Sequence, residues 1–131
     1  MDVLYYFISS LLDTNYVIGL VKQQEIVIKT VTDRAIETKA CAYSFVTRIE
    51  LLGFPGITSQ EIDGIERTLA QMQYAALTKE IEDCAITLRR KYRLKTPDAI
   101  IAATAKCLKL ELLTLDQQLA TRMQEIEANA E

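Results

Sequence analysis

The segment from Ala99 to about Leu108 constrains the fold more than any other part of the chain, because it is apolar on nearly every side. Thr96, Pro97 and Asp98 precede it; proline suits the first turn of a helix, and an acid favours the positive end of the helix dipole. We therefore predict a helix here. A helix that is apolar all round has to be packed centrally, against a sheet.

Strand-like and helix-like segments alternate along the rest of the chain. The predicted strands cover residues 3–12, 40–45, 74–77 and 110–115. The further helices are expected over residues 14–22, 24–35, 47–53, 58–71, 79–92 and 116–123, with Thr47–Glu50 and Thr58–Glu61 as capping boxes. This order predicts an α/β three-layer sandwich, with a short, mostly parallel central sheet flanked by helices. We expect one domain over residues 1–131, with a core of about 3–123 and a polar, frayed tail at 124–131.

The composition of the chain limits the class of protein to which it can belong. The chain has 131 residues, half of them hydrophobic and a quarter charged, as expected for one folded domain. Cys41, Cys84 and Cys107 are widely spaced among apolar residues, so we interpret them as reduced thiols of a cytoplasmic protein. The apolar start carries Asp2 instead of a basic region and is too short to span a bilayer, which predicts no signal peptide and no membrane span.

Four carboxylates, Asp13, Glu50, Asp98 and Asp116, stand at predicted strand ends or helix starts. Each alone could be a helix cap, a dipole partner or half of a capping box. Together they suggest one acidic site, because most are flanked by apolar residues and clustered acids need a compensating cation. The chain contains no histidine, which excludes a histidine base and a typical zinc site. Mg²⁺ or Mn²⁺ is the cation that carboxylates favour.

The fifth predicted helix ends in a basic run that continues beyond it, Arg89, Arg90, Lys91, Arg93 and Lys95. It can be a solubilising helix end that suits the negative dipole terminus. It can also be a phosphate-binding edge, in which Arg89, Arg90, Arg93 and Lys95 contact RNA. The four glycines form neither a dinucleotide-binding nor a P-loop pattern.

The ordered motifs Leu12-Asp13-Thr14-Asn15, Ile49-Glu50-Leu51, Thr96-Pro97-Asp98 with the apolar run after it, and Leu113-Thr114-Leu115-Asp116 resemble the PIN-domain nucleases. The likeness spans residues 11–119 and is greatest to VapC-type toxins of bacterial toxin–antitoxin pairs. It implies that the four acids are the catalytic, metal-binding quartet and that Thr14, Asn15 and Thr114 support it. One departure is that Gln118 and Leu119 stand where many relatives carry an acid and then an aromatic residue.

The resemblance implies an endoribonuclease dependent on Mg²⁺ or Mn²⁺, in which water attacks RNA and leaves 5′-phosphate and 3′-hydroxyl ends. It also implies a VapB-like antitoxin as partner and a homodimer, whose contact could include Tyr16, Val17 and Leu20 unless these pack in the core. Two alternatives stay open. One is a catalytically silent PIN-fold module that binds protein or RNA, favoured by Gln118. The weaker one is a phosphatase with Asp13 as nucleophile, which Thr14-Asn15 disfavours.

Overall fold

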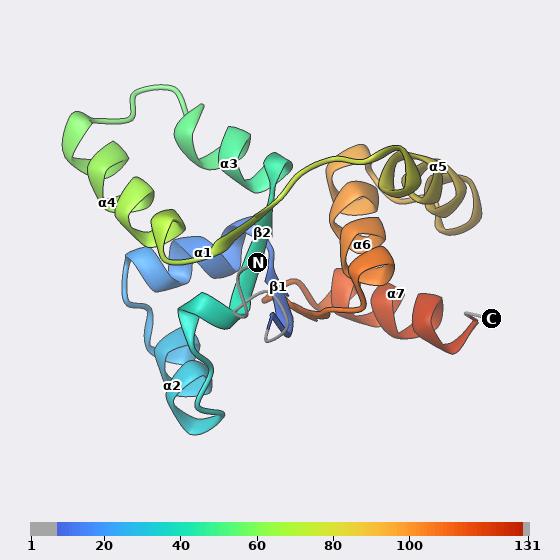
Figure 1. Cartoon of the computed structure of the whole chain (residues 1–131), viewed down its shortest axis with the longest axis horizontal. Coiled ribbons are helices and arrows are strands. Elements are labelled where there is room, and N and C mark those ends of the chain that lie inside the picture. Colours follow the sequence, from blue (N-terminus) through green and yellow to red (C-terminus); the bar gives the residue numbers. More distant parts are fainter. Residues whose placement is uncertain (1–7, 130–131) are drawn as a thin grey trace, which may run out of the picture.

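The computed structural model describes residues 8–129 and places a four-stranded sheet between two groups of helices (Figure 1). The strands are β1 (Ser10–Leu12), β2 (Cys41–Ser44), β3 (Gln73–Ala75) and β4 (Glu111–Leu113). Their order across the sheet is β3-β2-β1-β4, and all three neighbouring pairs are parallel. The predicted α/β sandwich is therefore confirmed. In such a sheet the carboxyl ends of the strands share one edge, where sites form.

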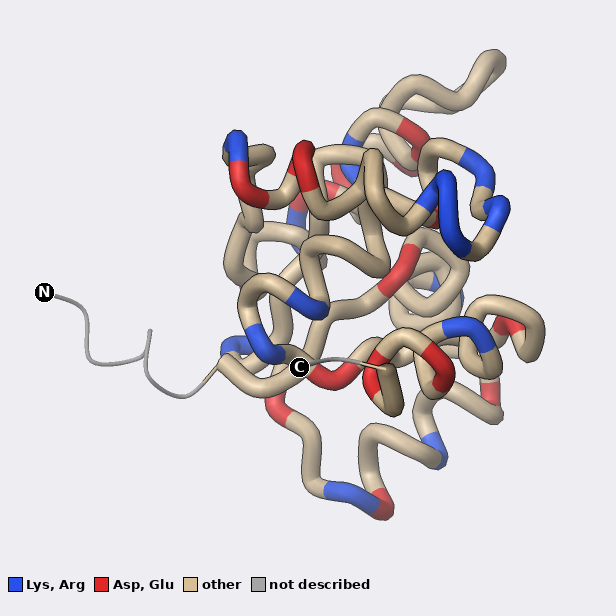
Figure 2. The backbone as a smooth tube through the Cα atoms, turned by 90° about the vertical axis from the view of Figure 1, so that its right-hand side faces the viewer, with Lys and Arg blue, Asp and Glu red and all other residues tan. Residues whose placement is uncertain are grey.

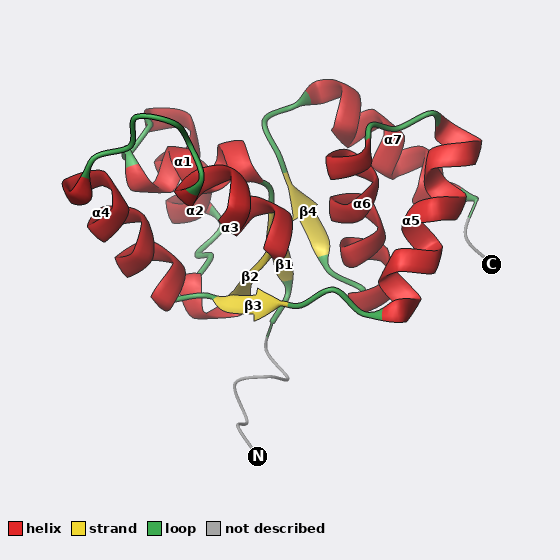
Figure 3. Ribbon diagram, turned by 90° about the horizontal axis from the view of Figure 1, so that it is seen from above, coloured by secondary structure: helices red, strands yellow, loops and turns green. Residues whose placement is uncertain are grey.

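Seven α-helices cover the sheet in the described part of the chain. Seen from above, α1 to α4 lie on one side of the strands and α5 to α7 on the other (Figure 3). Their bounds are α1 (Thr14–Val21), α2 (Glu25–Asp33), α3 (Phe45–Leu52), α4 (Ser59–Ala70), α5 (Lys79–Tyr92), α6 (Thr96–Leu108) and α7 (Gln117–Ala128), and a short 3₁₀ helix, η2 (Thr38–Ala40), precedes β2. These helices complete the three layers.

The strands divide their side chains between two hydrophobic cores. Leu11 of β1 and Ala42 of β2 join the core under α5, α6 and α7, whereas Leu12 and Tyr43 join the core under α1 to α4. This alternation is the period-two pattern of a strand covered on both faces. It explains why the strands read as continuous apolar runs.

Helix α6 lies where the sequence placed it, packed centrally. Ala99, Ala102 and Ala103 are fully buried, and α6 packs closely along α5 and beside β4. Small alanine side chains let the neighbouring backbones approach, and the apolar surroundings explain why the helix has no polar face over most of its length. The polar residues of this helix are thereby confined largely to its ends.

Two predictions about helix ends are wrong. The expected capping box of Thr47 and Glu50 does not form, because α3 begins at Phe45 and Ser44 is its N-cap, accepting a bond from the Val46 N–H at 2.9 Å. The last helix does not end near Met123 with a frayed tail; α7 continues to Ala128 and buries Ile126. Apolar contact with the core outweighs the polar composition of this stretch.

Other elements agree with the sequence to within a few residues. The capping box of Thr58 and Glu61 is present at the start of α4. The strand expected over residues 74–77 lies slightly earlier, at β3. The first strand, expected over residues 3–12, begins only at Ser10 in the described part of the chain, and residues 3–7 lie outside the described residues. The three cysteines are free thiols, as predicted. Among the described residues, no helix is long and apolar enough to cross a membrane.

Candidate active site

Asp13 is the most enclosed of the four candidate acids. It follows β1 directly and caps α1, where its Oδ1 accepts the Tyr16 N–H at 2.9 Å. The residue is only 5% exposed. Burial raises the pKa of its carboxyl, two hydrogen bonds, from Thr114 and Tyr16, act against that rise, and the charges of Asp116 and Asp98 add to it. Because Asp13 is buried and its pKa responds to the charges of two other acids, we place it at the centre of the candidate site.

Thr114 connects two of the acids through its hydroxyl. Thr114 Oγ1 donates a hydrogen bond to Asp13 Oδ2 and accepts one from the Asp116 N–H at 3.0 Å. Asp116 is exposed and caps α7, its Oδ1 accepting the Gln118 and Leu119 N–H groups at 2.9 and 3.2 Å. The Thr114 side chain thus adds to the backbone bond from the Asp13 N–H to the Leu113 carbonyl at 3.2 Å, which joins the ends of β1 and β4.

Asp98 lies in the first turn of α6 and is half-buried. Burial raises the pKa of its carboxyl, and the charges of Asp116 and Glu50 raise it further, while the charge of Lys95 lowers it. An acid in this turn benefits from the helix dipole. The start of a buried helix therefore places Asp98 close enough to Asp116 and Glu50 for their charges to act on it.

Glu50 completes the group from the opposite helical layer. Although it was expected near buried surface, it is exposed, as is its neighbour Ile49 at 64%. Thr14 Oγ1 donates to Glu50 Oε1 at 2.6 Å and lies 3.1 Å from the hydroxyl of Thr47. Thr47 is fully buried, and it was not among the site residues that the sequence suggested.

The four acids are electrostatic neighbours, but their side chains do not yet form a coordination shell. The charges of Asp116 and Glu50 add to the rise in the pKa of Asp98, and the charges of Asp116 and Asp98 add to the rise in the pKa of Asp13. Within residues 8–129, however, no three acidic or thiol side chains are arranged closely enough to hold a metal ion as they stand. Mutual repulsion of uncompensated carboxylates favours such separation.

The donor atoms nevertheless suit a hard divalent cation. All are carboxylate oxygens, and each carboxylate oxygen can accept more than one partner, so the bonds to Asp13 leave room for a further one. In the described residues, Asp98 makes no side-chain hydrogen bond, and Asp116 uses only Oδ1. Rotation of these two side chains requires no backbone change.

Basic residues border the acids on one side. Figure 2 shows Lys and Arg gathered where α5 ends. A hollow of about 190 Å³ next to this point is lined by Arg93, Lys95 and Arg122 together with Asp98 and Asp116. Arg122, in α7, was not anticipated from the sequence.

The remaining candidates have other surroundings. Arg89 directs its Nε to the carbonyl oxygen of Leu94 at 3.1 Å, which anchors the loop between α5 and α6. Arg90 is exposed on α5, and Asn15 is exposed in the first turn of α1. Tyr16 and Val17, considered for a dimer contact, are buried core residues, and Leu20 packs partly against the same core.

Comparison with solved structures finds the same architecture in several proteins, one of them a toxin–antitoxin complex. A toxin–antitoxin complex from Klebsiella pneumoniae is 30% identical, with a TM-score of 0.68 over 84% of this chain and 88% of that chain. VapBC-1 from nontypeable Haemophilus influenzae is 25% identical, with a TM-score of 0.68 over 88% and 92%. FitAcB from Neisseria gonorrhoeae, at 20% identity, shares the fold with a TM-score of 0.72 over 88% and 93%.

A search of curated proteins gave no match to this chain. The family model described as "PIN domain" matches residues 10–123, which include all four candidate acids and the whole sheet. The parallel sheet and the acids at its carboxyl edge agree with that match. On this evidence the chain belongs to the PIN domain family.

Proposed function

We propose that this chain is a cytoplasmic endoribonuclease dependent on Mg²⁺ or Mn²⁺, and that it is the toxin of a toxin–antitoxin pair. The observation that carries the proposal is the convergence of Asp13, Asp98 and Asp116 on one edge of the sheet, where burial and, after it, the charge of neighbouring acids raise the pKa values of Asp13 and Asp98. Membership of a nuclease family and likeness to toxin–antitoxin complexes support it.

The four acids would hold one or two divalent cations. Asp13 provides the fixed ligand, because its backbone and Thr114 bonds lock its orientation. In the part of the chain that the structure describes, Asp98 makes no hydrogen bond with its side chain and would be able to turn toward Asp13, whereas Asp116 is held by Oδ1 and would offer its unbonded Oδ2. Glu50 accepts a hydrogen bond from Thr14 in the opposite layer. The chemistry supplied by such an ion is a lowered pKa for water and neutralisation of charge on the phosphate.

Because the chain has no histidine, carboxylates would have to do the work of a general base. A bound cation would lower the pKa values of Asp13 and Asp98 by its opposite charge, so that both would stay ionised as ligands. A carboxylate oxygen of the quartet that does not hold the cation would accept the proton that the attacking water loses. The attacking group is water and not the neighbouring 2′-hydroxyl, so 5′-phosphate and 3′-hydroxyl ends are expected. Product ends can be identified by ligation and phosphatase sensitivity. Cyclic 2′,3′-phosphates would contradict this mechanism.

The metal site can be tested without knowing the RNA. Mn²⁺ is titrated into the wild-type protein and into Asp98→Asn, and bound metal is followed by water-proton relaxation. We expect the variant to lose most of the binding. Asp63→Asn, on the exposed face of α4, makes the same chemical change away from the site and should bind like the wild type. Equal binding by all three proteins would refute the quartet.

The proposal includes two binding partners, an antitoxin and a second copy of this chain. We expect a VapB-like antitoxin to bind the chain, since one similar structure, at 30% identity, is of a toxin–antitoxin complex and another, at 25% identity, is VapBC-1. We also expect a homodimer. Size-exclusion chromatography with light scattering tests the dimer, and a monomer at micromolar concentration would count against it.

A catalytically silent PIN-fold module is the second candidate. It is favoured by Gln118, which replaces an expected acid, and by the absence, among the described residues, of three acidic side chains already close enough to hold an ion. This candidate predicts no Mn²⁺ binding in the relaxation experiment and no cleavage of RNA. Measurable binding that depends on Asp98 excludes it as the explanation of the quartet.

A further inference from the structure

The hollow beside the acids combines charges of both signs. Asp98 and Asp116 line it together with Arg93, Lys95 and Arg122, which come from the α5–α6 loop and from α7. These segments lie on the same side of the molecule (Figure 3). We propose that Arg93, Lys95 and Arg122 form a subsite for the RNA phosphate that follows or precedes the one at the acids. This inference rests on the proposed function and adds the path of the strand.

The loop that carries two of these cations is held in place. Arg93 ends α5 in the left-handed conformation, with φ of 56°, and its N–H caps the Arg89 carbonyl. Leu94 is buried, and its own carbonyl accepts the Arg89 Nε bond. Arg93 and Lys95 therefore project from either side of an anchored residue, which limits the entropy lost when they bind a ligand.

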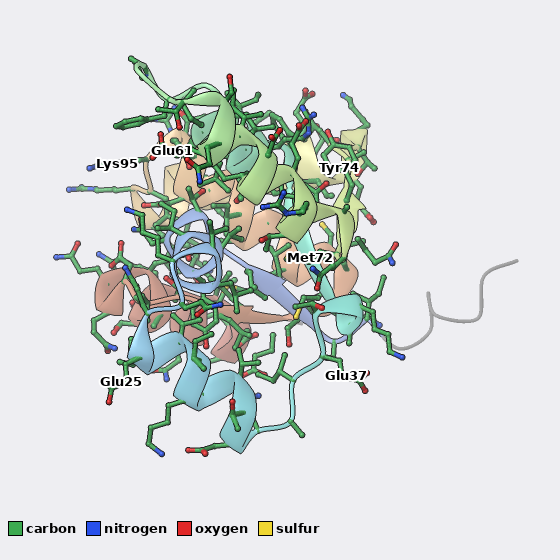
Figure 4. The ribbon with its side chains drawn as sticks, turned by 90° about the vertical axis from the view of Figure 1, so that its left-hand side faces the viewer. Glu25, Glu37, Glu61, Met72, Tyr74 and Lys95 are labelled. Atoms are coloured by element: carbon green, nitrogen blue, oxygen red, sulfur yellow. The ribbon has the colours of Figure 1, made fainter. Side chains whose placement is uncertain are left out.

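The cations are available to an incoming anion. Within residues 8–129, neither Arg93 nor Lys95 has an acidic partner within 4.0 Å. The Lys95 side chain points away from the body of the molecule in Figure 4. Arg122 pairs only with Glu125, one helical turn away at 3.1 Å, and both are about half exposed. Such exposed pairs contribute little and exchange readily.

The start of α6 adds to the positive potential. Lys95 is its N-cap residue and makes no side-chain hydrogen bond to the first turn. Asp98 in the first turn offsets part of the positive potential at this end of the 13-residue helix, and the remainder adds to that of the basic side chains lining the hollow. The arginines can donate two parallel hydrogen bonds to phosphate oxygens. An RNA strand suits a hollow with charges of both signs, because one phosphate can meet a cation held by the acids while a neighbouring phosphate of the same strand meets the basic side chains.

The test measures RNA binding separately from cleavage. Fluorescence anisotropy of short single-stranded oligo(U) and oligo(A) is recorded in EDTA over a series of salt concentrations. We expect Arg122→Gln to weaken binding several-fold and to reduce the slope of log K against log salt by about 0.7, the value for one phosphate contact with a single strand. The loss should be equal for both sequences, because phosphate contacts carry no base information.

Arg34→Gln is the matched control. Arg34 has the same exposed side-chain fraction as Arg122, 47%, and also pairs with a glutamate, Glu111, but at the opposite end of β4. It should leave RNA binding unchanged. Lys95→Gln should act like Arg122→Gln, and Arg122→Lys should retain most of the salt slope.

The outcomes separate this inference from the proposed function. Equal effects of Arg122→Gln and Arg34→Gln, no RNA binding by the wild type at low salt, or displacement of RNA by an equal concentration of oligoglutamate would each overturn the subsite. If these occur while Mn²⁺ binding still depends on Asp98, only the subsite fails. If RNA binding depends on Arg122 but Mn²⁺ does not bind, the subsite is supported and the nuclease proposal fails.

Discussion

Replacing Thr114 by valine tests the bridge between the ends of β1 and β4. Valine has nearly the same shape but cannot donate to Asp13 or accept from the Asp116 N–H. A hydrogen bond to a charged group contributes about 1.5–3 kcal/mol. The Asp116 N–H can turn to water because that residue is exposed, whereas Asp13 is buried and cannot. We therefore expect the free energy of unfolding to fall by about 2 kcal/mol at neutral pH.

The same number predicts a thermal shift. An unfolding entropy of about 2.1 cal/mol/K per residue over 131 residues converts 2 kcal/mol into a drop in Tm of about 7 °C. The assay is urea and thermal unfolding in EDTA, so that no cation offsets the charge of the acids. Thr104→Val is the control, because the Thr104 hydroxyl is also buried but donates at 2.7 Å to the neutral Ile100 carbonyl of its own helix.

The pH dependence identifies the charge as the cause. The folded-state pKa of Asp13 is raised, so the stability linked to this group is present at low pH and is lost as the pH rises through the folded pKa. Without Thr114, which lowers that pKa, the loss extends to higher pH. The deficit of Thr114→Val should therefore be largest at neutral pH and shrink on acidification. A deficit below about 0.5 kcal/mol, or one independent of pH as for Thr104→Val, would refute the reasoning.

Three further substitutions, one of them with a control, test core packing and a helix cap by urea unfolding. Gly19→Ala should destabilise by about 1–3 kcal/mol, because a Cβ there would lie 2.5 Å from Val27 Cγ2 in the core; a neutral effect would mean that Val27 can move aside. Ile126→Ala should cost about 2–5 kcal/mol, whereas Ile49→Ala, 64% exposed, should cost little; equal costs would contradict the extended α7. Thr58→Ala should cost about 1 kcal/mol by removing a helix cap, and no change would argue against the capping box.

Much of the architecture follows from local signals in the sequence. The Thr96-Pro97-Asp98 start and the apolar run after it predict α6, and its all-round burial predicts the central position. The end of α7 was missed although Leu119, Met123 and Ile126 are all buried at helical spacing. The many polar residues of this stretch drew attention away from the helical spacing of these three apolar residues, which is the signal that predicts the longer helix.

The site was harder to predict than the fold. Asp13 could be singled out because an acid next to apolar residues is unusual. Asp98 could be singled out because it stands in the helix start that precedes the long apolar run. Thr47 and Arg122 could not, because nothing local distinguishes a buried threonine near Glu50 or one more charged residue on α7; only the tertiary arrangement places them beside the acids. Glu50 was singled out because apolar residues flank it, but Ile49 and Glu50 itself are exposed, so that local reason was wrong.

The alanine-lined packing of α6 has a consequence for how the site fails under stress. Ala99, Ala102, Ala103 and Ala105 are at most 1% exposed, so this helix cannot shift sideways without opening the core. Amide hydrogens in this part of α6 should consequently exchange only by global unfolding. The carboxylate of Asp98 would then keep its place until the whole domain melts, and ion binding should disappear in the same cooperative transition as the tertiary structure rather than before it.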